Sequence, residues 1–153
     1  MRLLAATAAR KPDIGSAEAL KRTLLAAKSI AYSASVSGDY IANVLYPRLG
    51  VADQVAAKSR RISGERVADA VARGDAEIGF QQVSELLPVK GADYVGPLPP
   101  EVQRATTFSA GIAVGAREPD AARSLIEFYV SRAAAPVIAR TGLEPLTLSR
   151  PGR

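Results

Sequence analysis

Short apolar runs alternate along this chain with segments whose apolar residues recur at helical spacing. Strands are predicted at 3–9, 28–33, 59–62, 76–80, 92–96 and 106–116. Helices are predicted at 17–27, 38–48, 52–58, 64–73 and 83–87, and from Pro119, with an interruption near Pro136, to Gly142. Alternating strands and helices predict an α/β fold with a mostly parallel sheet flanked by helices.

A proline-rich stretch divides the chain. Pro97-Leu98-Pro99-Pro100 fits neither a central strand nor a helix interior, because three of its four residues lack a backbone N–H. We therefore predict an α/β lobe over 1–105 and a C-terminal strand-helix segment over 106–153.

Composition limits the kinds of catalytic and metal-binding sites that the chain can form. The 153 residues are 48% hydrophobic, which is typical of a folded domain, and include neither Cys nor His. Disulfides, Cys/His metal sites and His-based acid/base catalysis are thereby excluded, and no obvious pair of carboxylates replaces them. We expect no catalytic residues and no metal ligands; a small enzyme ranks third among the hypotheses.

Charge and hydropathy give little sign of nucleic acid or membrane. The net charge is +5, but the basic residues are scattered and no aromatic residues alternate with them, so a solvated basic surface is preferred to nucleic-acid binding. No apolar run approaches the roughly 18–20 residues of a membrane span. Residues 1–10 superficially resemble a secretory signal, but their apolar part is short and is interpreted as a strand.

Small polar residues gather where predicted strands end and helices begin. In an open α/β sheet these strand ends meet at one edge, where backbone N–H groups and hydroxyls hold anions. The alternative is that the serines only cap helices. The two glutamines argue for a site, because consecutive amides after an apolar strand are costly to bury and are not needed as caps. The candidates are Ser33, Ser35, Ser37, Gly38, Ser63, Gly64, Gln81 and Gln82.

Several segments resemble a known family. They are Lys11-Pro12-Asp13-Ile14, the run from Leu24 to Ser33, Val71 to Gly79, Ser84 to Val89 and Val95 to Pro99. Over about residues 8–146 the chain resembles the molybdate-type extracellular solute-binding proteins of ABC importers. The resemblance implies a type II periplasmic binding fold, whose two lobes close on an oxyanion, an ABC permease as partner and a periplasmic location.

The same resemblance implies where the ligand would lie. Second-lobe contacts fall near 34–38, at 64–67, which adds Val67 to the candidates, and at Gln82. Molybdate binders usually have Tyr at the position of Gln82, which leaves the identity of the oxyanion open. A full family member also has a first lobe, whereas only about ten residues precede Lys11 here.

The missing first lobe predicts an exposed apolar surface on the C-terminal segment. We expect a homodimer to cover it. Our first hypothesis is a truncated domain that binds a small oxyanion such as molybdate or tungstate and has no other cofactor. The alternative is a dimeric structural or interaction protein. Without a convincing signal peptide, a cytoplasmic location stays open. The residues of this surface are Leu125, Ile126, Tyr129, Val130, Val137 and Ile138.

Overall fold

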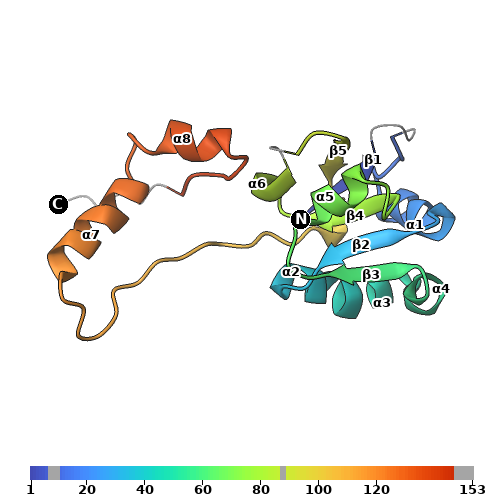
Figure 1. The fold of residues 1–153 in the computed structure, drawn as a ribbon, viewed down its shortest axis with the longest axis horizontal. Coiled ribbons are helices and arrows are strands. Elements are labelled where there is room, and N and C mark those ends of the chain that lie inside the picture. Colours follow the sequence, from blue (N-terminus) through green and yellow to red (C-terminus); the bar gives the residue numbers. More distant parts are fainter. Residues whose placement is uncertain (7–10, 87–88, 147–153) are drawn as a thin grey trace. The chain divides into compact units, whose positions relative to one another are not determined.

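A five-stranded sheet organises the N-terminal part of the chain in our computed structural model, which describes residues 1–6, 11–86 and 89–146 (Figure 1). β2 pairs in parallel with β3 and β4, and β1 runs antiparallel to both β4 and β5. Four of the five strands therefore point the same way, which confirms the predicted mostly parallel α/β fold. The strands are β1 (Arg2–Ala6), β2 (Ile30–Ser33), β3 (Ser59–Ile62), β4 (Ile78–Gln81) and β5 (Ala92–Pro97), in the order β3-β2-β4-β1-β5.

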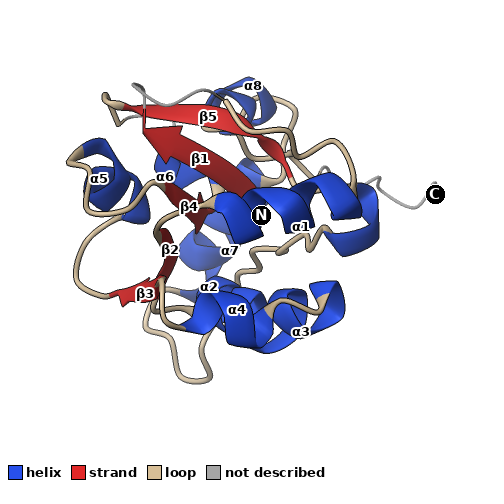
Figure 2. Ribbon diagram, turned by 90° about the vertical axis from the view of Figure 1, so that its right-hand side faces the viewer, coloured by secondary structure: helices blue, strands red, loops and turns tan. Residues whose placement is uncertain are grey.

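Helices cover both faces of this sheet (Figure 2). One face packs against α1 (Ala17–Ala26), α4 (Ala52–Ala56) and the helical run 36–49, and the other against α5 (Val67–Ala72) and α6 (Val83–Leu86). Strand side chains alternate between the two cores: Leu3 belongs to the first and Leu4 to the second. This alternation is the period of two that a strand imposes.

The helical run after β2 contains three consecutive segments, α2 (Val36–Tyr40), the π-helix η1 (Ile41–Leu45) and α3 (Tyr46–Leu49). It begins two residues before the predicted start at 38. The wide η1 turn lies just before Pro47, whose ring has no N–H and would crowd the Asn43 carbonyl four residues earlier. Gly50 then ends the run in the left-handed region at φ 65°, as predicted.

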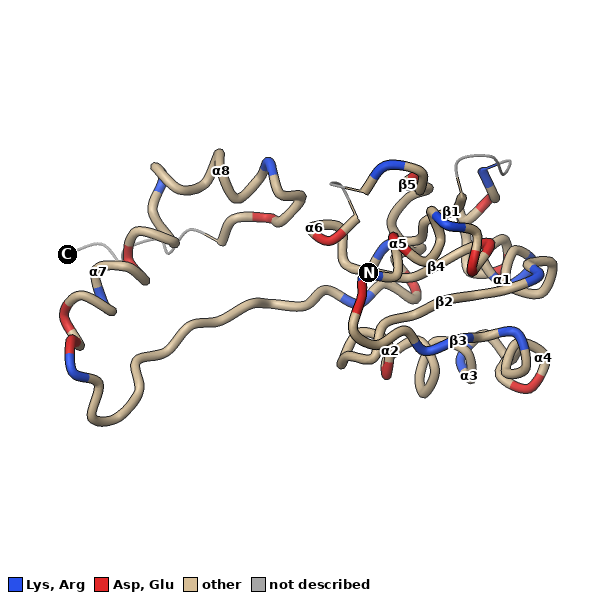
Figure 3. The backbone as a smooth tube through the Cα atoms, in the orientation of Figure 1, with Lys and Arg blue, Asp and Glu red and all other residues tan. Residues whose placement is uncertain are grey.

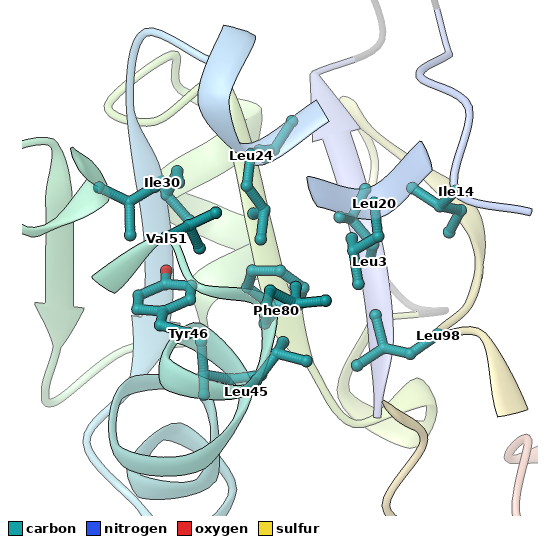
Figure 4. Packing of buried hydrophobic residues seen from close by; sticks show 14 of the residues in the cluster. Leu3, Ile14, Leu20, Leu24, Ile30, Leu45, Tyr46, Val51, Phe80 and Leu98 are labelled. Atoms are coloured by element: carbon teal, nitrogen blue, oxygen red, sulfur yellow. The ribbon is translucent and has the colours of Figure 1, made fainter. Parts of the chain in front are cut away.

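The larger core lies between the sheet and α1, α4 and the helical run (Figure 4). Phe80 of β4, 1% exposed, is at its centre, next to Leu3 on β1. Tyr46 is buried there with its hydroxyl 3.1 Å from that of Ser59. Burial raises the pKa of Tyr46 to about 12.

Two compact units divide the chain, Met1–Ala105 and Thr106–Arg153. The first also contains the short 3-10 helix η2 (Pro100–Val102), and the second contains α7 (Pro119–Tyr129) and α8 (Ala135–Arg140). The strand predicted over 106–116 is wrong, since no strand is present in that stretch. A strand needs a neighbour that accepts and donates its ladder hydrogen bonds, and apolar residues alone do not supply one.

The second unit does not cover its own apolar residues. Leu125, Phe128 and Tyr129 on α7 are each more than half exposed, as is Val137 on α8. The homodimer expected to cover this segment stays a prediction.

Two further findings concern the ends of predicted elements and the membrane. Residues 7–9 of the first predicted strand, and Leu87 at the end of the helix predicted over 83–87, lie outside the described residues. Among the residues that are described, no helix is long and apolar enough to cross a membrane.

Tyr46→Phe tests the buried phenol. Because the folded pKa lies above the ordinary 10.0, the phenol stabilises the fold below pH 10 and loses this contribution as pH rises towards 12. We expect wild type to lose up to roughly 3 kcal/mol of unfolding free energy between these pH values that Tyr46→Phe does not lose. Urea unfolding at pH 9 to 11.5 measures this. Tyr129→Phe, at an exposed tyrosine, is the control; parallel pH profiles for wild type and Tyr46→Phe would contradict the assignment.

Candidate functional site

Three serine hydroxyls form a triangle at the carboxyl end of β2. The Oγ atoms of Ser33 and Ser35 are 2.7 Å apart, those of Ser33 and Ser37 3.1 Å, and those of Ser35 and Ser37 2.9 Å. Ser37 is buried, whereas Ser35 is exposed. Each hydroxyl carries one proton and accepts at two lone pairs, so Ser37 can donate to a neighbouring serine while Ser33 and Ser35 turn their protons towards an anionic group beside them.

Helix capping does not explain Ser35. It is the N-cap residue of α2, yet its side chain makes no capping hydrogen bond. Ser16 shows the ordinary arrangement at α1, where its Oγ accepts from the Ala19 N–H at 3.1 Å. The interpretation of these serines as caps therefore fails at Ser35, whose described hydroxyl contacts are to the other two serines.

Gly38 brings the helical run against the end of β2. A Cβ atom at this position would lie 1.7 Å from the Ser33 carbonyl oxygen and 2.8 Å from its carbonyl carbon. No real side chain tolerates such a contact with backbone. Gly38 therefore shapes the site without offering a side chain to it.

A pocket of about 230 Å³ opens beside the triangle, at the carboxyl ends of β2, β3 and β4. The structure thus brings five of the predicted residues around one space. Ser37, Gly38, Val67 and Gln82 do not line it. The lining residues are Ser33, Ala34, Ser35, Ile62, Ser63, Gly64, Glu65, Arg66, Gln81 and Glu85.

The two glutamines differ, and Val67 has a packing role. Gln81 is 3% exposed, and its Oε1 accepts from the Ala68 N–H at 3.0 Å. The prediction that neither amide is needed as a cap is therefore wrong for Gln81, which supplies the first turn of α5 with an acceptor from another element. Gln82 is partly exposed. Val67 is fully buried, and its Cγ1 would lie 2.6 Å from a Cβ at Gly79.

Charged residues on the pocket wall were missed by the argument from neutral donors. Arg66 donates from Nε and Nη2 to the two Asp69 carboxylate oxygens at 2.8 and 3.1 Å, which leaves donors on Nη1. Glu65 accepts from both terminal nitrogens of Arg73, at 2.7 and 2.9 Å. Their adjacency to Ser63-Gly64 in sequence was the available signal.

Ion pairs stabilise the charged forms of Glu65 and Arg66. Hydrogen bonds from Arg73 hold the pKa of the Glu65 carboxyl below its usual value. Hydrogen bonding to Asp69 raises the pKa of Arg66, and Glu85 adds to this by charge interaction at longer range. Lys and Arg elsewhere are spread along α1, α3 and β3 (Figure 3), and the expectation that nucleic acid is not bound stays a prediction.

Potential metal ligands do not cluster among the described residues of the pocket. In the part of the chain that the structure describes, no group of three or more acidic, His or Cys side chains could hold an ion. The arrangement instead combines neutral hydroxyl donors, one guanidinium and two carboxylates.

A sheet with a polar pocket at the carboxyl ends of its parallel strands defines the class of open α/β ligand-binding domains. The family follows from comparison with known sequences: a family model described as "Bacterial extracellular solute-binding protein" matches residues 2–144. The chain belongs to this family.

Two relatives differ in what their names say. An aconitate isomerase from a Pseudomonas species is 44% identical over 138 residues, which cover 90% of this chain and 53% of that protein. The structure of the substrate-binding domain of a protein assigned as a molybdenum ABC transporter, from Clostridium difficile, matches with a TM-score of 0.72 at 18% identity, covering 97% of this chain and 63% of the other. At that identity the structural match shows the fold alone. The chain spans about half the length of the isomerase.

Gly38→Ala tests the close approach that shapes the site. The new methyl group must push the helical run away from β2, and we expect a loss of at least about 3 kcal/mol in unfolding free energy, the upper range for overpacking. Denaturant unfolding measures the loss. Gly111→Ala is the matched control, because nothing lies within 4 Å of a Cβ built there. Equal stability of the two variants would refute the constraint.

Proposed function

We propose that this chain binds a small polycarboxylate anion of the aconitate type at the carboxyl ends of β2, β3 and β4. The observation that carries the proposal is the serine triangle, whose exposed member has no capping role. Its two hydroxyls on the pocket wall, Ser33 and Ser35, offer donors to one carboxylate without a fixed counter-charge.

Arg66 favours a ligand with a second carboxylate. Its guanidinium lines the same pocket, and two of its five donors are already held by Asp69, which fixes the orientation of the plane. The free edge of a planar guanidinium can pair with both oxygens of one carboxylate, which would add a second anchoring point for a ligand that carries two such groups. The 44% identity to an aconitate isomerase supports the same ligand class.

Molybdate is the competing ligand. The prediction of molybdate rests on the resemblance seen in the sequence. The structural relative with molybdenum in its name supports only the fold. Membership in a family of extracellular solute-binding proteins supports, as further parts of the proposal, a periplasmic location and an ABC permease as partner. The isomerase name of the closer relative in sequence supports a second candidate function, catalysis on the bound anion.

Isothermal titration calorimetry against aconitate, citrate, molybdate and sulfate tests the binding proposal. We expect saturable binding of aconitate and a roughly tenfold to hundredfold loss of affinity in Ser35→Ala, because a hydrogen bond to a charged group is worth about 1.5–3 kcal/mol. Ser109→Ala, at an exposed serine outside the pocket, is the control. Molybdate binding without aconitate binding would overturn the ligand class. No heat with any anion would favour the interaction-protein alternative.

Arg66→Lys tests whether the ligand pairs with the planar guanidinium. Lys keeps the positive charge but loses the planar pair of donors, so we expect aconitate affinity to fall by about tenfold or more. Arg48→Lys, at an exposed arginine on α3, controls for surface charge. Unchanged aconitate affinity in Arg66→Lys would contradict the assigned role of Arg66.

A further inference from the structure

Two carboxylates line the pocket, and among the residues that the structure describes only one of them has an ion-pair partner. Glu65 makes two hydrogen bonds to Arg73, which also binds Asp75 at 2.7 Å. The Glu85 carboxylate makes no hydrogen bond or ion pair with any described residue, although it lies on the same pocket wall. The proposed binding function does not use Glu85, and a carboxylate in an anion pocket weakens binding by charge repulsion.

The fold holds Glu85 at this wall. β4 ends at Gln81, and α6 begins two residues later at Val83. The neighbouring Leu86 is 5% exposed and belongs to the core under α5, which anchors α6. Glu85 itself is exposed, and its backbone N–H donates to the Gln82 carbonyl at 3.1 Å. The carboxylate is thus carried on an anchored turn beside the serine end of the sheet.

Aconitate is a carbon acid that needs only a base to isomerise. A methylene group flanks its double bond, and loss of one methylene proton leaves an allylic carbanion that is delocalised into the carboxylates. Return of the proton to the other end of the allyl unit moves the double bond and can give either geometric isomer. One C–H bond breaks and one forms, the proton rides on the base in between, and no oxidant or cofactor enters.

The residue types at the pocket leave little choice of base. The chain contains no His and no Cys. Arginine does not give up its proton in proteins, and the described lining residues include no Lys or Tyr. Glu65 is a poor base because Arg73 stabilises its ionised form. Among the described lining residues, Glu85 is therefore the remaining candidate for the base.

Resting on the proposed aconitate-type ligand, we infer that Glu85 is the catalytic acid–base residue that takes a proton from the methylene carbon and returns it at the other end of the double bond. Arg66 lines the same wall and offsets the negative charge that develops on the ligand carboxylate. On this assignment, a pocket that only binds aconitate and a pocket that isomerises it differ by one carboxylate, that of Glu85.

Proton NMR of aconitate in D₂O with the full 153-residue chain tests this assignment. Wild type should replace the methylene protons by deuterium and form the other geometric isomer. Glu85→Gln should slow the exchange at least a hundredfold, the low end for a positioned general base, while calorimetry shows aconitate affinity within a few-fold of wild type. Glu127→Gln, at an exposed glutamate on α7, is the matched control.

Each other outcome is decisive. Exchange at the wild-type rate in Glu85→Gln, or its loss in Glu65→Gln alone, assigns the base elsewhere and overturns the inference. Aconitate binding by wild type without any methylene exchange also overturns it and leaves the proposed binding function intact. If wild type does not bind aconitate, the proposed function fails together with the inference. Thermal melts of all variants check that folding is unchanged.

Discussion

The contact between the helical run 36–49 and the end of β2 governs the candidate site. It exists because position 38 has no side chain: any Cβ there would meet the Ser33 carbonyl. With the helix this close, serines at 33, 35 and 37 come within hydrogen-bond distance of one another although a strand end and a helix start carry them. β2 in turn is fixed between β3 and β4, so the three parallel strand ends share one pocket.

Regular structure was largely predictable where local pattern and tertiary context agree. The buried strands β2 and β4 and the end of the helical run at Gly50 follow from β-branched and apolar runs and from a left-handed glycine. The structure of the stretch 106–116 was not predicted correctly, because an apolar run forms a strand only when another strand pairs with it. The π-helix before Pro47 also has no simple signature, since proline more often ends a helix than widens it.

The location of the site could be predicted from the sequence, but the contacts of its side chains could not. Strand ends in a parallel sheet converge, so the serines and Gln81 could be placed together from sequence. That Gln81 would accept from Ala68 on a different element depends on how α5 packs, which no local pattern encodes. The roles of Glu65 and Glu85 could not be predicted either, because both have the sequence pattern of ordinary surface residues. Only the structure shows that both line the pocket and that Arg73 pairs with Glu65.

The mixture of groups at the pocket also bears on how binding and catalysis relate in this fold. Neutral hydroxyls hold an anion without fixing its charge, so they tolerate a carboxylate whose electrons shift during a reaction. A guanidinium held by Asp69 keeps its orientation while charge moves towards it. Neither feature is needed in a pure binding site, but neither impairs one. A solute-binding lobe is therefore already close to a proton-transfer catalyst for a carbon acid, and a carboxylate such as Glu85, which has no ion-pair partner among the described residues, is the group that would complete it.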